Sequence, residues 1–94
     1  MKPVLVTTEN RGVFFGYLEV EPTELPAKIV LKNMRNCVSW QSSIHGVFGL
    51  ASSGPDKNCR IGPKVPSATL YKITSVTDCT PEATEKWEMG IWMS

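Results

Sequence analysis

Short apolar runs separated by polar segments mark the first part of the chain, and their composition is typical of β-strands. Residues 3–8 are rich in Val, Leu and Thr, which favour extended backbone. The polar segment 9–12 predicts a turn, so residues 13–20 form a second strand antiparallel to the first. Gly16 within that strand predicts a bulge or a close crossing, because glycine weakens regular strand packing and lets another chain approach.

A second group of strands is expected downstream. Residues 27–34 alternate around Ile29 and Leu31, and residues 36–41 continue this strand after a kink. Residues 59–61 predict a short strand, and residues 68–77 predict one longer strand whose apolar side chains enter the core.

The segment 42–51 leaves two readings open. Its apolar positions fit one face of a short helix capped by Ser42 or Ser43. Gly46 and Gly49 weaken the helix, so a strand or a single helical turn also fits.

The helix signal is clearest at the C-terminal end. Thr80 is suited to cap a helix, and Pro81 follows it at the first helical position. Ala83 and Trp87 are four residues apart and share one face, which predicts a helix running to about Met89. Trp87 is expected to be a core or subunit-contact anchor rather than a platform for a ligand.

These elements predict one α+β domain spanning residues 1–94. It has about five short antiparallel strands and a C-terminal helix, and a small SH3-like or Sm-like barrel is compatible with the pattern. No apolar run reaches the ~20 residues that span a bilayer, and no signal peptide is evident. The three cysteines form no close pair, so a disulfide framework and a zinc site are not expected and a reducing cytoplasm fits best.

Charge is unevenly distributed although the net charge is only +1. Residues 28–64 carry six basic residues and one acid, whereas the segments on either side are acidic. This arrangement predicts a local anionic ligand and makes a general nucleic-acid partner improbable. Matching of charges within the fold or between subunits is the alternative explanation.

The central stretch 35–64 holds the candidate binding residues. An aromatic ring beside a Gly/Ser-rich basic loop can hold a base and its phosphates. An ordinary connection built of turn residues explains the same composition equally well. The predicted ligand-binding residues are Arg35, Trp40, His45, Ser53, Lys57, Asn58, Arg60 and Lys64.

Catalysis is not expected. The chain lacks a phosphate-binding P-loop, a zinc-binding histidine pair and a nucleophile elbow. Cys37 or Cys59 could pair with the single histidine, His45, but buried structural cysteines are far commoner. We therefore expect a binding protein without metal or cofactor.

Three motifs occur in a fixed order: Arg-Asn-Cys-x-x-Trp from residue 35, Gly-Leu-Ala-x-x-Gly-Pro from residue 49, and Cys-Arg-Ile from residue 59. With this order, residues 30–92 resemble a family of small, mostly phage- and prophage-encoded proteins of uncharacterised-domain type. In size, cytosolic character and loop composition the chain is also similar to the anti-CBASS and anti-Thoeris sponges of phages. That likeness is one of class and assigns a role to no individual residue.

The resemblance implies a phage immune-evasion protein acting in the cytoplasm of the infected bacterial host. Such a sponge is a homo-oligomer that sequesters a cyclic dinucleotide such as cGAMP, or a related nucleotide signal, without cleaving it. The alternative is a small β-barrel interaction module that binds a host protein or single-stranded nucleic acid. Neither reading involves a membrane.

Overall fold

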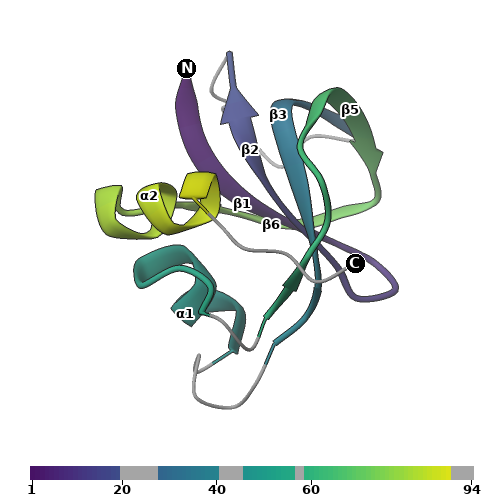
Figure 1. Cartoon of the computed structure of the whole chain (residues 1–94). Coiled ribbons are helices and arrows are strands. Elements are labelled where there is room, and N and C mark those ends of the chain that lie inside the picture. The colour runs from purple at the N-terminus through teal and green to yellow at the C-terminus, as the bar shows by residue number, and fades with distance from the viewer. Residues whose placement is uncertain (20–27, 41–45, 57–58, 90–94) are drawn as a thin grey trace.

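Six strands and two helices make up the computed structural model, which describes residues 1–19, 28–40, 46–56 and 59–89. The elements in chain order are β1 (Lys2–Thr8), β2 (Gly12–Leu18), β3 (Lys28–Ser39), α1 (Gly46–Ser52), β4 (Arg60–Ile61), β5 (Val65–Tyr71), β6 (Ile73–Asp78) and α2 (Pro81–Met89) (Figure 1). The strands form one antiparallel sheet in the order β4-β3-β2-β1-β6, with β5 also paired to β3. This confirms the α+β class and the C-terminal helix, and the sheet is open.

The N-terminal hairpin forms as predicted. β1 and β2 pair in continuous register from Lys2 opposite Leu18 to Thr8 opposite Gly12. The turn between them contains two successive left-handed residues, Asn10 (φ 63°) and Arg11 (φ 64°). Two successive positive φ angles match the right-handed twist of paired strands, so the turn keeps the strands in register.

Gly16 marks an irregularity between β2 and β3, which confirms the prediction of a bulge or close crossing. The β2–β3 register shifts between Phe15 and Tyr17. A Cβ atom at Gly16 would lie 2.8 Å from the Cβ of Leu31, so only glycine permits this approach. The third strand continues past residue 34 as predicted. Its left-handed residue is Asn33, with a φ of 49°, which precedes the kink predicted between residues 34 and 36.

The single strand predicted over residues 68–77 is wrong, because the chain forms two strands there. Lys72 has a φ of 56° and separates β5 from β6. β5 pairs with β3, whereas β6 pairs with β1. A lysine does not reveal from its residue type that its backbone is left-handed. The apolar and β-branched residues on both sides of Lys72 therefore predicted one continuous strand.

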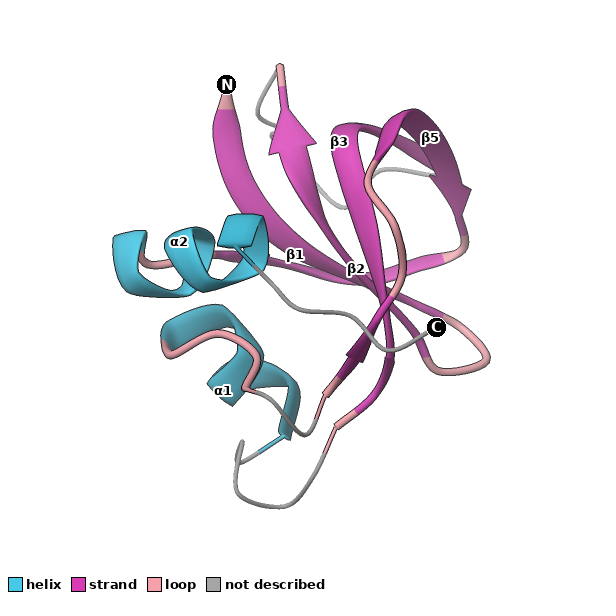
Figure 2. Cartoon of the chain, viewed as in Figure 1, coloured by secondary structure: helices cyan, strands magenta, loops and turns pink. Residues whose placement is uncertain are grey.

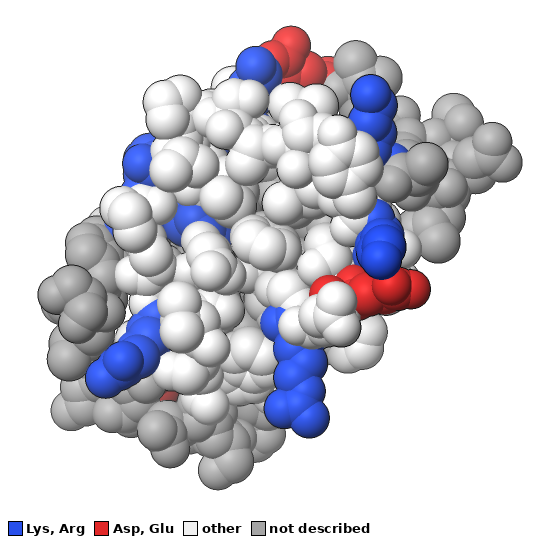
Figure 3. Space-filling model, turned by 90° about the vertical axis from the view of Figure 1, so that its right-hand side faces the viewer, with Lys and Arg blue, Asp and Glu red and all other residues white. Residues whose placement is uncertain are grey.

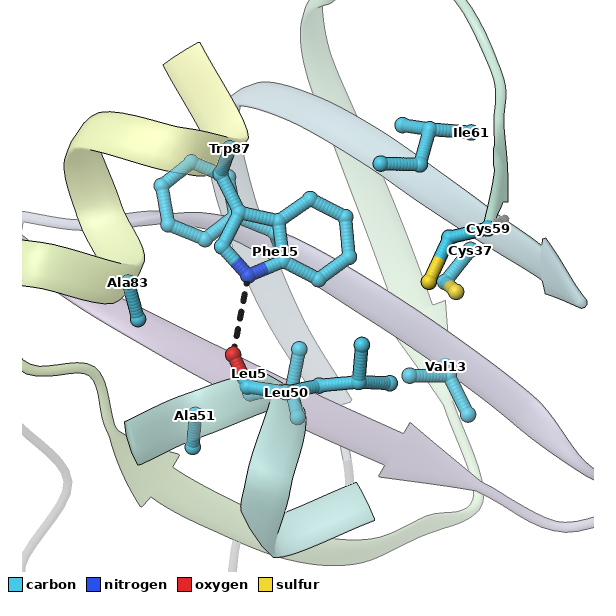
Figure 4. Close-up of a cluster of buried hydrophobic side chains, with 10 residues drawn as sticks. All are labelled: Leu5, Val13, Phe15, Cys37, Leu50, Ala51, Cys59, Ile61, Ala83 and Trp87. Atoms are coloured by element: carbon cyan, nitrogen blue, oxygen red, sulfur yellow. Dashed lines mark hydrogen bonds between the residues drawn. The ribbon is translucent and has the colours of Figure 1, made fainter. Parts of the chain in front are cut away.

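Both faces of the sheet bury apolar side chains. The two helices lie side by side against one face, as Figure 2 shows. The core beneath them is made of Leu5, Val13, Phe15, Cys37, Leu50, Ala51, Cys59, Ile61, Ala83 and Trp87 (Figure 4). A second core is made of Val4, Val6, Leu18, Ile29, Leu31 and Ile73. β1 serves both cores because successive side chains point to opposite faces.

The helix prediction within residues 42–51 holds for the described part, since α1 begins at Gly46. Its predicted caps, Ser42 and Ser43, lie outside the described residues. The N-cap of α2 is confirmed: the amide of Ala83 donates to Thr80 Oγ1 at 3.0 Å. The same hydroxyl donates to the carbonyl of Ser52 at 2.6 Å, so the cap also ties α2 to the end of α1.

Gly54 brings the segment after α1 directly against α2. Its φ is 85°, and a Cβ there would lie 2.9 Å from Lys86 Cβ and 3.0 Å from Ala83 Cα. Gly46 has a similar φ of 79°, but a Cβ there would meet nothing within 4 Å. A side chain at either position would be strained by the positive φ, but only a side chain at Gly54 would also be crowded by its neighbours.

We predict that Gly54→Ala destabilises the protein more than Gly46→Ala. Both substitutions incur the ~1–2 kcal/mol cost of a left-handed alanine. Only Gly54→Ala adds overpacking against α2, which costs a further ~1–3 kcal/mol. Urea unfolding of the two variants measures the difference, and equal losses of stability would show that Gly54 is not crowded by α2.

Candidate functional site

A groove opens beside the turn of the β1–β2 hairpin. It has a volume of about 510 Å³. The hairpin supplies most of its wall, while the end of β3 and the helix α1 supply the rest. The lining residues are Thr7, Thr8, Arg11, Gly12, Val13, Trp40 and Val47.

The groove joins an aromatic ring, a cation and hydroxyl groups. Trp40 is half-buried and packs against the core beneath the helices, which holds its ring in place. Arg11 is exposed at the hairpin turn. A guanidinium can bind phosphate or carboxylate through two parallel hydrogen bonds, and an indole can stack on a flat ring.

The hydroxyl of Thr7 belongs to a small hydroxyl cluster across β1 and β6. Thr7 Oγ1 lies 2.7 Å from Thr74 Oγ1 and 2.5 Å from Ser75 Oγ. Each hydroxyl can both donate and accept, so a ligand oxygen or nitrogen can join this cluster. The groove volume lies within the ~300–1,000 Å³ range of small-molecule sites.

Arg35 serves the fold rather than an open site. Its side chain is only 3 % exposed. Nη1 donates to the carbonyl oxygen of Trp87 at 2.8 Å, and Nε donates to the carbonyl oxygen of Gly62 at 3.3 Å. Burial lowers the pKa of Arg35, and the nearby charge of Glu88 acts in the opposite direction. The guanidinium therefore links β3 to α2 and to the segment after β4.

Lys64 is also paired with Glu88 and does not line the groove. Its Nζ forms an ion pair with Glu88 of α2 at 3.2 Å. Burial, followed by the charge of Glu88 and a hydrogen bond to it, raises the pKa of Tyr17. Arg35, Lys64 and Tyr17 thus lie around one carboxylate, that of Glu88. This carboxylate neutralises part of the positive charge that was predicted to bind an anionic ligand.

Trp40 and Arg60 are brought to the same end of the sheet. Arg60 is exposed on β4, and its Cα pairs with Ser39, the residue before Trp40. Ser53 is exposed after α1, where its amide donates to Gly49. Neither Arg60 nor Ser53 lines the groove. The other predicted site residues, His45, Lys57 and Asn58, lie outside the described residues.

The sequence analysis missed the groove residues of the hairpin. Arg11 stands in an acidic N-terminal segment, whereas most basic residues lie in the central segment 28–64. The available signal was Arg11 in a tight turn, where its side chain must be exposed. Pairing of β1 with β2 and packing of Trp40 bring it near the indole.

Cys37 and Cys79 are poor nucleophiles in this structure. None of Cys37, Cys59 and Cys79 forms a disulfide. Burial, with the nearby Cys59, raises the pKa of Cys37 to about 12. Burial, with the nearby Asp78, raises the pKa of Cys79 to about 12. Over the described part of the chain, no three His, Cys, Asp or Glu residues gather as a metal site.

The described residues form a small antiparallel α+β domain with a groove beside the turn of its first hairpin. The chain belongs to the family described as "Domain of unknown function (DUF6948)", whose model matches residues 1–87. No match was found among curated proteins or among solved structures. Neither of the described helices has the length and apolar character needed to cross a bilayer.

We predict that Arg35→Ala lowers the free energy of unfolding by ~2–4 kcal/mol, because two carbonyl groups lose a charged donor. Lys64→Ala is the matched control, since an exposed ion pair contributes only ~0–1 kcal/mol. Chemical denaturation of both variants tests this. If the two variants are equally stable, Arg35 does not hold α2 to the sheet.

We predict that the native thiols of Cys37 and Cys79 resist alkylation near neutral pH. A pKa of about 12 leaves less than ~0.01 % thiolate at pH 7.5. The thiols ionise at a lower pH in the unfolded chain than in the folded protein. Their contribution to the free energy of unfolding is therefore fully present below about pH 9 and is lost as the pH rises towards 12. Iodoacetamide labelling of native and urea-unfolded protein checks the first point, and rapid labelling of the native protein would contradict it.

Proposed function

We propose that this protein binds a nucleotide-type ligand in the groove between Trp40 and Arg11, and that it does so without catalysis. The observation that carries the proposal is the position of a fixed indole and an exposed guanidinium in one groove with ordered hydroxyl groups. A base stacks on Trp40, a phosphate binds Arg11, and a sugar hydroxyl or phosphate oxygen joins the hydroxyl of Thr7.

The biological role that fits this binding is that of a phage sponge. The ligand is then a cyclic dinucleotide such as cGAMP, or a related nucleotide signal, held intact in the cytoplasm of the infected bacterium. Support comes from the sequence resemblance and from the described groove, which combines an indole, a guanidinium and threonine hydroxyls.

A sponge of this kind acts as a homo-oligomer. The groove has one indole and one guanidinium among its lining residues, whereas a cyclic dinucleotide has two bases and two phosphates. Two copies related by a twofold axis would present two indoles and two guanidinium groups, matching the symmetry of the ligand.

The second candidate function is an interaction module for a protein. Phe48 on α1 is 71 % exposed, and Val38 on β3 is 61 % exposed. Exposed apolar side chains of this size are common at protein contacts. Protein binding through them would not depend on nucleotide.

We predict that Trp40→Ala and Arg11→Gln each weaken binding of the preferred cyclic nucleotide. Loss of base stacking, worth ~1–3 kcal/mol, raises the Kd on the order of 5- to 100-fold. Thermal melting against a panel of cyclic di- and trinucleotides and cyclic ADP-ribose isomers finds the ligand, and calorimetry measures the Kd of each variant.

Arg60→Gln is the matched control, because Arg60 is exposed near Trp40 but does not line the groove. If Arg60→Gln weakens binding and Arg11→Gln does not, the ligand binds at the central loop predicted from sequence. Chromatography of the recovered ligand completes the test: intact ligand supports a sponge, and altered ligand indicates an enzyme. No shift with any ligand contradicts nucleotide binding and favours the protein-binding module.

A further inference from the structure

The outer face of the β3–β5 pair forms a second surface, whose residues do not line the groove. Three cross-strand pairs lie on it: Lys28 opposite Tyr71, Val30 opposite Thr69, and Lys32 opposite Ser67. We call this surface the ribbon face and define it by these residues together with Lys72, which follows Tyr71.

The ribbon face is fixed by burial on the other side of the same strands. Ile29 and Leu31 of β3 are buried in the second core, so their neighbours in β3 must point outward. Val30 is 42 % exposed and Tyr71 is 62 % exposed. An aromatic ring at such exposure covers no core and is available to a partner.

Lysines dominate the charge of the ribbon face. Lys28 lies opposite Tyr71 across the two strands, exposed Lys72 follows Tyr71 in sequence, and Lys32 lies further along β3. Lys32 forms an exposed ion pair with Glu19, in which Nζ lies 3.6 Å from a carboxylate oxygen. The backbone amide of Glu9 donates a hydrogen bond to the carbonyl oxygen of Lys72. Figure 3 shows the side of the molecule near β5, where basic side chains are spread over a mainly uncharged surface.

α2 covers another part of the same sheet face, since Lys32 pairs with Tyr17 and Tyr17 packs in the core beneath the helices. In Figure 1 α2 lies on one side of the strands β1 and β2, and β5 lies on the other side, beyond β3. Glu88, the acid of α2 next to Tyr17, forms an ion pair with Lys64. A net charge of +1 therefore conceals a local group of lysines on the ribbon face, and a basic patch can bind a polyanion on a nearly neutral protein.

We propose that the ribbon face binds single-stranded nucleic acid. Tyr71 stacks on one base, Lys28, Lys32 and Lys72 contact phosphates, and the hydroxyls of Ser67 and Thr69 hydrogen-bond to the strand. Stacking on an aromatic ring beside cations is the way that proteins bind single strands with little sequence preference. A protein partner is less favoured because Val30 and Tyr71 are separated by lysine and threonine.

The test is fluorescence anisotropy with labelled single-stranded oligonucleotides, one of DNA and one of RNA, over a series of salt concentrations. We expect Tyr71→Ala to raise the Kd on the order of 5- to 100-fold, as expected for a lost stacking contact. Replacing Lys28 and Lys72 by Gln should lower the slope of log K against log salt by ~1.4, since each phosphate contact contributes ~0.7 for single strands.

Two variants serve as matched controls. Phe48→Ala removes another exposed aromatic ring, and Lys86→Gln removes another exposed lysine, both outside the ribbon face. The proposal requires that neither control changes the Kd. Failure of the parent protein to bind either oligonucleotide at low salt overturns it, as does equal weakening by Tyr71→Ala and Phe48→Ala.

Arg11→Gln separates this surface from the groove. If oligonucleotide binding persists in Arg11→Gln while cyclic nucleotide binding is lost, the two sites are distinct. If Arg11→Gln abolishes oligonucleotide binding and Tyr71→Ala has no effect, the strand binds in the groove and the ribbon face has no such role.

Discussion

The indole of Trp87 is the contact on which the arrangement of helices and sheet depends. Its ring stacks on Phe15 of β2, with ring centroids 5.2 Å apart and an interplanar angle of 4°. Its Nε1 donates to the carbonyl oxygen of Leu50 at 3.1 Å, and its own carbonyl oxygen accepts from Arg35. One residue thus joins α2 to β2 and to α1 (Figure 4), and through Arg35 to β3. Burial of the indole nitrogen and of the carbonyl oxygen is compensated because each has a partner.

This attachment positions the groove indirectly. The helix α1 is held by Leu50 and by the cap of α2, and Val47 of α1 forms one wall of the groove. Trp40 packs against the same core. The hairpin turn closes the groove from the other side, where two left-handed residues present Arg11. The hairpin and the core therefore place the exposed guanidinium of Arg11 and the packed indole of Trp40 in one groove. This arrangement would suit a ligand that has both a flat ring and a negative charge.

Acidic residues and lysines gather on different elements of the protein. Acidic residues concentrate on α2, and one of them, Glu88, is occupied by Lys64. Lysines of β3 and those around β5 lie on the ribbon face, where the cross-strand register places them beside Tyr71. The two proposed sites, the groove and the ribbon face, use different strands and different aromatic residues.

How much the sequence determined follows from the range of the interactions involved. Strand alternation, the Thr80 cap, the bulge at Gly16 and the burial of Trp87 arise from local pattern and residue size, and all of them were predicted. The turn at Lys72 was missed because a left-handed lysine resembles any other lysine in composition.

The choice of site residues depended on tertiary contacts. Arg35 was predicted to face a ligand, yet its guanidinium is buried between the carbonyl groups of Gly62 and Trp87, residues distant in sequence. Arg11 lines the groove only because β1 pairs with β2 and Trp40 packs nearby. The sequence by itself determined which residues could bind an anion, whereas the tertiary structure decided which of them are exposed, because the partners that occupy a cation are brought to it by folding.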